Sequence, residues 1–419
     1  MKKVLFLTLL VLVVSLFAGP TIRVLVWDDA LTRAVLEKLP EFEKATGIRV
    51  EMELVPSGNV LQKIAVGVSS NSTQYDIVAV DEPYVPQIGK LLEPYDKWPK
   101  GKYYEKPDLN VILEETFKAA VLRDVIVGLP INGNVYVWMT RKDIIEKYKD
   151  EFMKEYGYEM MVPQTFEALL DMAKFLKKKG IYGFAPFTKS TEGSTCEAMM
   201  MFEAYGTTPI MFDKETGKYR VVLNKERAKK AMEMYKELLK YAPEGANNYG
   251  HSERIAAFNQ GKVFSMFQWP AIIPDHENPD KSMVVGNIIY SAPPSGDIRR
   301  AAVRGAWVLG IPKASKNKEA AAEFAYWWSS YKAGKELVKV GMTPARVDLL
   351  KDPELAKDRP WFEGIFESMK YAISRPRIEN YPEVSNIIRT YWLAGVTGQM
   401  SIDEALDKMV EELKNVVEK

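Results

Sequence analysis

The sequence predicts an α/β fold built on a doubly wound, largely parallel sheet. Short apolar runs alternate with amphipathic helical patterns, which is the order expected of such a sheet. After Asp76, residues 77–80 form an unbroken apolar run between turn formers, which is typical of a strand buried on both faces. The 419-residue length allows two or three domains, and the apolar and aromatic content is ample for a large core.

The first part of the chain has the order β-α-β-α-β. In its first helix the apolar residues, among them Leu31, Val35 and Phe42, fall on one stripe. Gly47 stands just past the end of this helix, where glycine is most favoured. The expected strands are residues 21–27, 48–55 and 76–80, and the expected helices are residues 30–46, 59–68 and 84–92.

The alternation of strands and helices continues to the C-terminus. Thr165 is a good helix N-cap, and Ser401 is spaced from Glu404 as in a capping box. Residues 130–134, rich in Gly and Asn, join two strands either as a hairpin or as a path that crosses between two lobes. Further strands are expected at residues 125–129, 135–139, 181–187, 263–269, 284–290 and 308–311, and further helices from residues 141–143 onward and at 163–179, 196–205, 225–241, 255–259, 319–331, 381–394 and 401–417.

Residues 1–19 have the layout of a secretory signal peptide. Lys2 and Lys3 precede the apolar run 4–17, which small residues follow and which is too short for an ordinary membrane span. Leu16 makes the cleavage site imperfect, so a retained N-terminal anchor is the alternative. No cysteine lies nearby to carry a lipid. The pattern predicts export to the periplasm or the cell exterior.

Composition excludes several classes of site. Cys196 is the only cysteine, which rules out an intramolecular disulfide framework and a cysteine-based metal centre. His251 and His276 are the only histidines, which argues against a zinc site built from histidines. The net charge of +1 gives no reason to expect a nucleic-acid partner. We therefore expect no metal and no cofactor.

An acidic and aromatic turn follows the buried strand at residues 76–80. It consists of Asp81, Glu82, Pro83 and Tyr84. Ligands of open α/β sheets bind at the carboxyl ends of the strands, which makes this turn a candidate binding site. The alternative is a solvated loop whose acidic residues favour a helix N-terminus.

Several stretches, taken in order, resemble one family. The stretches are FEKATGIRVEME (42–53), YDIVAVDEPYVPQIGKLLEPYD (75–96), VGLPINGNVYVWMTRKDI (127–144), FNQGKVFSMFQW (258–269), WVLGIPKASKNKEAAAEFAYWW (307–328), MTPAR (342–346) and GQMSIDEALDKMVEEL (398–413). Together they resemble the extracellular solute-binding proteins of ABC importers, in the carbohydrate-binding group that includes maltose-binding protein. Residues 36–53 and 59–89, with Trp307, are most similar to members that take sugar alcohols and small sugars.

The resemblance implies a periplasmic-binding-protein-like fold of two α/β lobes with a ligand cleft between them. Lobe 1 would hold residues 20–131 and 303–344, and lobe 2 would hold residues 132–302 and 345–419. Two or three segments would cross between the lobes, near residues 131–134, 302–307 and 342–346, and each holds Gly or Pro, as hinges often do. The implied function is binding of a carbohydrate or polyol by hinge closure and delivery to the transmembrane permease of an ABC importer, by a monomer.

A carbohydrate cleft needs two kinds of side chain. Hydroxyls around the edge of the ligand are bound by carboxylates, amides and guanidinium groups, whereas its C–H faces stack on aromatic rings. The candidates for the first role are Asp28, Asp29, Asp81, Glu82, Asn132, Asn134 and Arg346, and those for the second are Tyr84, Trp269 and Trp307. The strands that end at Trp27, Val80 and Trp269 would bring their ends to the cleft walls. Tyr249 and Phe187 are weaker candidates.

Each candidate has a structural alternative. Asp29 would equally serve as the cap of the helix at 30–46, and Asn134 would equally serve only its turn. Glu82 would face solvent, and Trp307 would be a core wedge beside the hinge. Arg346 would pair with an acid on the other lobe, which would also be cleft chemistry.

The rival class is a secreted glycoside hydrolase that uses cleft carboxylates as acid and base. Asp81 and Glu82 are adjacent, which is a poor arrangement for flanking one bond. No nucleophile elbow, phosphate-binding loop or HExxH motif is present. A metal or anion carrier is a third class, disfavoured by the scarcity of histidine and by the many acids. We expect a binding protein and no enzyme.

Overall fold

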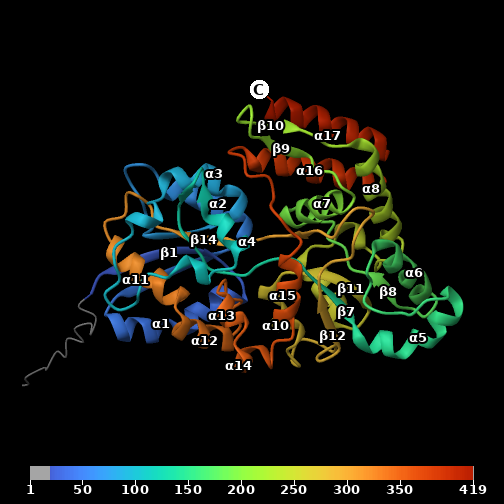
Figure 1. Cartoon of the computed structure of the whole chain (residues 1–419), viewed down its shortest axis with the longest axis horizontal. Coiled ribbons are helices and arrows are strands. Elements are labelled where there is room, and N and C mark those ends of the chain that lie inside the picture. Colours follow the sequence, from blue (N-terminus) through green and yellow to red (C-terminus); the bar gives the residue numbers. More distant parts are fainter. Residues whose placement is uncertain (1–18, 419) are drawn as a thin grey trace, which may run out of the picture.

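The first lobe is built on a five-stranded sheet. The computed structural model describes residues 19–418, and its two α/β lobes lie side by side in Figure 1. The strand order is β2 (Arg49–Val55), β1 (Thr21–Trp27), β3 (Ile77–Asp81), β14 (Trp307–Gly310) and β6 (Leu129–Pro130). Strand β1 pairs in parallel with β2 and β3, whereas β14 is antiparallel to β3 and β6, with Trp307 opposite Asp81.

The predicted β-α-β-α-β order of this lobe is confirmed. Every residue of β3 is buried, as expected for a strand covered on both faces. Helix α1 (Ala30–Thr46) begins after the Asp29 cap and ends at Gly47, whose φ of 72° is the left-handed conformation that favours glycine. Helices α2 (Ser57–Gly67), α11 (Lys318–Ser329) and α12 (Tyr331–Lys339) also belong to this lobe.

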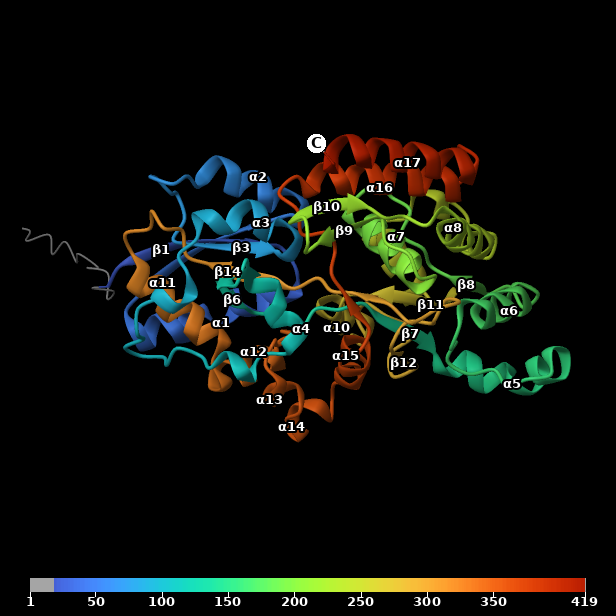
Figure 2. The ribbon, with the colours of Figure 1, turned by 45° about the horizontal axis from the view of Figure 1, so that its top comes forward.

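The second lobe carries a four-stranded mixed sheet. Its order is β12 (Ile288–Ser291), β7 (Val137–Arg141), β11 (Val263–Gln268) and β8 (Tyr182–Phe184). Strand β7 is antiparallel to both of its neighbours. The covering helices are α5 (Lys142–Tyr156), α6 (Phe166–Lys177), α7 (Glu192–Ala204), α8 (Lys225–Leu239), α9 (His251–Asn259), α15 (Trp361–Met369), α16 (Tyr381–Val396) and α17 (Ile402–Val417). Figure 2 shows α16 and α17 packed side by side at the edge of this lobe.

The remaining elements are short. They are helices α3 (Val85–Ile88), α4 (Glu114–Phe117), α10 (Ile273–His276), α13 (Val347–Leu350) and α14 (Pro353–Ala356), and strands β4 (Val121–Leu122), β5 (Val125–Ile126), β9 (Ile210–Asp213), β10 (Lys218–Val221), β13 (Ala302–Val303) and β15 (Ala372–Ile373). The hairpin of β9 and β10 and the helices α13, α14 and α15 were not expected from the sequence. The single strand expected at 125–129 is divided between β5 and β6.

Two segments cross between the lobes as a hydrogen-bonded ribbon. Residues 131–136 lead from β6 to β7, and residues 304–306 lead from β13 to β14. The Ile131 N–H donates to the Trp307 carbonyl at 3.1 Å, and the Tyr136 N–H donates to the Val303 carbonyl at 2.9 Å. The Gly/Asn stretch at 130–134 is therefore a crossing path and not a hairpin.

The third passage falls later than residues 342–346, where we expected it. The Leu113 N–H donates to the Ala345 carbonyl at 2.9 Å, which holds this turn on the first lobe. Helices α13 and α14 pack against α12, also on the first lobe, and the chain reaches the second lobe only at α15, which packs on β12 and β7.

The predicted signal peptide at residues 1–19 lies almost wholly outside the described residues. Within residues 19–418, no helix has the length and apolar character needed to cross a membrane.

Candidate functional site

A cavity of about 340 Å³ lies between the two lobes. The first lobe supplies the carboxyl ends of β1 and β3 and the start of β14. The second lobe supplies the start of α7, the start of α9 and the turn after β11. Strand ends and helix starts thus converge on one space, as the rule for α/β sheets predicts.

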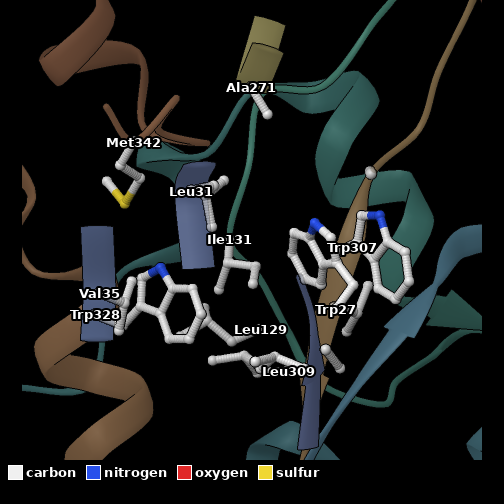
Figure 3. Packing of buried hydrophobic residues seen from close by; sticks show 14 of the residues in the cluster. Trp27, Leu31, Val35, Leu129, Ile131, Ala271, Trp307, Leu309, Trp328 and Met342 are labelled. Carbon is white, nitrogen blue, oxygen red and sulfur yellow. The ribbon is translucent and has the colours of Figure 1, made fainter. Parts of the chain in front are cut away.

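A pair of indole rings forms the wall on the first lobe. Trp27 ends β1 and Trp307 begins β14, and their rings stack with centroids 4.2 Å apart and planes 21° from parallel. Figure 3 shows the two rings side by side at the end of the apolar core that holds Leu31, Leu129 and Ile131. Both tryptophans line the cavity although most of their surface is buried. Trp307 therefore combines the two roles that the sequence left open, core packing and a place at the cleft.

Asp28 and Asp29 follow Trp27 at the rim of this wall. The exposed Asp28 carboxylate accepts a hydrogen bond from Arg33 Nε at 2.8 Å. Asp29 caps α1, because its carboxylate accepts from the Thr32 N–H at 3.0 Å. Both line the cavity, so Asp29 serves as a cap and faces the cavity at once. Burial in the surrounding protein raises the pKa of Asp29 to about 6.

An arginine that the sequence did not suggest holds the carboxylates at the inner end of the cavity. Arg375 Nη1 lies 2.9 Å from Asp81 Oδ2 and 3.1 Å from Glu192 Oε1, and Nη2 donates to the other Asp81 oxygen. Asp81 ends β3 on the first lobe, whereas Glu192 begins α7 on the second. Burial raises the pKa of Asp81, and the Arg375 charge opposes that shift. Arg375 therefore links the two lobes at the site.

Trp269 forms the wall on the second lobe, in the turn after β11. Its half-buried ring packs on Tyr136, with centroids 4.0 Å apart. Its backbone N–H donates to Gln268 Oε1 at 2.9 Å, which fixes the turn. Beside it, Asn134 Nδ2 donates to the Gly305 carbonyl at 3.0 Å. Trp269, Asn134 and Gly305 all line the cavity.

The cavity is also lined by a cysteine and a histidine, whose side chains can in principle react or bind metal. Cys196 lies on α7 with its thiol buried, which raises the pKa of that thiol and leaves it in the unreactive protonated form. His251 begins α9 and meets the Phe187 ring edge-on, with ring centroids 4.8 Å apart. No group of three or more potential metal ligands occurs in the part of the chain that the structure describes.

Six of the ten predicted binding residues line the cavity and four do not. The six are Asp28, Asp29, Asp81, Asn134, Trp269 and Trp307. Glu82 is fully buried and accepts from Arg304 at 2.8 and 2.6 Å, because neighbouring residues at a strand end point to opposite sides. Tyr84 packs edge-on against Tyr381, with ring centroids 5.5 Å apart.

The other two serve the hinge region and the first lobe. Asn132 is buried in the crossing ribbon, where its Oδ1 accepts from the Trp307 N–H at 2.8 Å. Arg346 pairs with Asp348 at 2.6 Å, on its own lobe. The weaker candidates Phe187 and Tyr249 also lie outside the lining.

Trp27 lines the cavity at a strand end that the sequence placed on a cleft wall, but several polar lining residues were not predicted. Ser57 follows the end of β2, where the rule that ligands bind at strand ends also applies, whereas Arg33 lies in the first turn of α1. Glu192, Cys196, His251, Asp275 and Arg375 carried no comparable signal. Arg375 in particular lies between β15 and α16, in a stretch without periodicity.

Comparison with known proteins agrees with the fold and the cleft. Residues 28–335 match the model of the bacterial extracellular solute-binding protein family. A probable amino-acid ABC transporter periplasmic-binding protein of Sinorhizobium fredii is 25% identical over 353 residues, which cover 82% of this chain and 77% of that protein. The mannitol-binding protein of Pseudomonas aeruginosa is 24% identical over 406 residues, which cover 90% and 88%.

A solved structure shows the same fold over 95% of this chain. The maltose-bound MalE3 of T. maritima superposes with a TM-score of 0.80 at 25% identity, covering 95% of this chain and 100% of that one. The family model spans well over half of the sequence, and the cavity lies between two lobes of the matching fold. The chain therefore belongs to the bacterial extracellular solute-binding protein family.

Proposed function

We propose that this chain binds a small carbohydrate outside the cytoplasm and delivers it to the membrane permease of an ABC importer. The observation that carries the proposal is the pairing of two aromatic walls with fixed carboxylates around one cavity. Trp27 and Trp307 face it from the first lobe and Trp269 from the second. Maltose-bound MalE3 and the mannitol-binding protein, both similar over most of the chain, support the same ligand class.

The polar groups suit the edge of a neutral polyol. Asp28 and Asp81 present carboxylate oxygens that accept hydrogen bonds from hydroxyls, while Arg33 and Arg375 supply donors. Each of these carboxylates already has a cationic partner, so a neutral ligand leaves the charge balance of the cavity unchanged. The indole faces take the C–H groups of the ligand.

The size of the cavity favours a short ligand. A volume of about 340 Å³ is near the lower end of the range for ligand pockets. A monosaccharide or a linear sugar alcohol fits this space, whereas a long oligosaccharide needs more. We therefore place small sugars and sugar alcohols ahead of longer chains.

The remaining parts of the proposal concern transport. Residues 1–19 would export the chain, and the two lobes would close over the ligand about the crossing ribbon, as hinge proteins do. The chain would act as a monomer that meets the transmembrane subunits in its closed form. It would bind its ligand without turning it over, as expected of a family of binding proteins that includes maltose-bound MalE3.

Mass spectrometry of ligand released from the purified protein tests the proposal directly. A thermal-shift panel of D-mannitol, ribitol, D-glucose, maltose and L-amino acids accompanies it, because a ligand that binds only the folded state raises the melting temperature. A sugar or polyol should be released and should be recovered unchanged after hours of incubation. Release of an amino acid, or hydrolysis of maltose that scales with the protein, would contradict it.

A further inference from the structure

Gly305 lies in the crossing ribbon, directly against the edge of the Trp269 ring. We infer that it is a positioning residue for that ring and thereby determines how wide a ligand the cavity accepts. The ligand part of this inference rests on the proposed function, whereas the ring contact does not.

The contact leaves no room for a side chain. A Cβ built on Gly305 would lie 2.7 Å from Trp269 Cζ3 and 2.9 Å from Cη2, and also 2.9 Å from Asn134 Nδ2. All of these distances are shorter than real Cβ contacts allow. Even the smallest side chain at this position must therefore displace the indole, the Asn134 amide, or both.

The ribbon is held by hydrogen bonds, and the ring is supported on one face by a buried side chain. The Gly305 N–H donates to the Asn134 carbonyl at 2.9 Å, and Asn134 Nδ2 donates to the Gly305 carbonyl at 3.0 Å, so Gly305 is held from both sides. The Trp269 ring packs on Tyr136, which is almost fully buried and packs in turn on Phe267 at 5.7 Å between centroids. The open direction for a displaced indole is the cavity that it lines.

The backbone of Gly305 does not itself require glycine. Its φ lies outside the left-handed region, unlike that of Gly47 or Gly286. An alanine at 305 adopts the same backbone without strain, so its effect comes from the contact alone. Gly58 has an ordinary φ as well and nothing within 4 Å of its built Cβ, which makes Gly58→Ala the matched control.

The consequence is a cavity that narrows when position 305 gains a methyl group. An indole pushed from its support on Tyr136 would occupy space that the ligand needs. Ligands that fill the cavity should lose more affinity than ligands that leave part of it empty.

A double-mutant cycle in stability tests the ring contact without any ligand. Denaturant midpoints are measured for Gly305→Ala in the wild-type background and in the Trp269→Ala background. Gly305→Ala should lower the midpoint in the first and lose more than half of that effect in the second, where only the Asn134 contact remains. Gly58→Ala should not lower it in either. An equal loss in both backgrounds, or a failure of Gly305→Ala to fold in both, overturns the inference.

Calorimetric titration with D-mannitol and with maltose tests the ligand part. For each probe that binds the wild-type chain, Gly305→Ala should weaken binding at least tenfold, and the loss should be larger for maltose when both probes bind. In the Trp269→Ala background the same change should cost less than twofold. If Gly305→Ala lowers the affinity equally in both backgrounds, then Gly305 does not determine the width of ligand that the cavity accepts. If neither probe binds the wild type, the proposed ligand class is in doubt, and the stability cycle still decides the ring contact.

Discussion

Replacing Trp269 by alanine tests whether its ring binds the ligand or packs the core. The ring is half-buried, lines the cavity and packs on the Tyr136 ring, with centroids 4.0 Å apart and planes tilted by 32°. A stacked aromatic pair contributes about 0.5–1.5 kcal/mol beyond its buried area, and full burial of a tryptophan contributes about 3–5 kcal/mol. We therefore expect Trp269→Ala to lower the free energy of unfolding by only about 1–2 kcal/mol.

The loss in binding should be larger than the loss in stability. A central aromatic contact carries roughly 2–4 kcal/mol, so the Kd of the released ligand should rise by about 30-fold to 1,000-fold. Calorimetric titration gives the Kd, and chemical denaturation of the same variant gives the stability.

Trp98→Ala is the matched control for this experiment. Trp98 is 3% exposed and donates through Nε1 to the Glu93 carbonyl at 3.1 Å, away from the cavity. Its loss should cost about 3–5 kcal/mol of stability and leave the Kd of the folded fraction unchanged. If Trp269→Ala shows the pattern expected of Trp98→Ala, then Trp269 packs the core and the stacking argument is refuted.

Three further predictions concern charge. The pKa of Asp29 is raised from 3.8 to about 6, so folding takes up a proton between these pH values. The contribution of Asp29 to the free energy of unfolding therefore falls as pH rises through this interval, by up to about 1.4 kcal/mol per pH unit. Asp29→Asn should remove this pH dependence, as measured by denaturation at pH 4, 5 and 6. Burial lowers the pKa of the His276 imidazole from 6.5 to about 3, so below pH 6.5 the unfolded chain binds a proton that the folded chain does not. The free energy of unfolding therefore falls as pH drops below 6.5. His276→Gln should reduce this fall in the same denaturation series. Arg375→Met should lower the free energy of unfolding by roughly 3–5 kcal/mol, because it leaves Asp81 and Glu192 without their cation. Adding Asp81→Asn should restore part of this loss. If the double variant is no more stable than Arg375→Met alone, loss of the ion pair is not the cause of the destabilisation.

The part of the fold that the sequence predicted best is the part with local signals. Helix α1 has its predicted bounds because its apolar stripe, its Asp29 cap and Gly47 agree. Strand β3 was recognisable because both of its faces are buried. The third passage between the lobes was misplaced because nothing local in residues 342–346 shows that Ala345 is held by Leu113, far earlier in the chain.

In the candidate site, too, the residues that the sequence predicted are those with a local signal. Asp28 and Asp81 reach the cavity because the carboxyl ends of β1 and β3 lie at the same edge of the first-lobe sheet, and Trp269 reaches it from the carboxyl end of β11 in the second-lobe sheet. Glu82 follows Asp81 directly in sequence but is buried against Arg304, a partner that no local pattern predicts. Arg375 was out of reach because its partner Asp81 lies 294 residues away and no periodic pattern marks either as a pair.

The position of β14 in the first sheet has a consequence for how the chain folds during synthesis. This strand lies between β3 and β6, yet it leaves the ribosome only after all four strands of the second-lobe sheet. The sheet that begins at the N-terminus therefore stays open, with the edge of β3 unpaired, until most of the protein has been made. Pairing so distant in sequence is slow to form, because the chain entropy of a long loop must be lost first. If the chain is exported, as proposed above, in an unfolded state, this delay would leave time for it to cross the membrane before it folds.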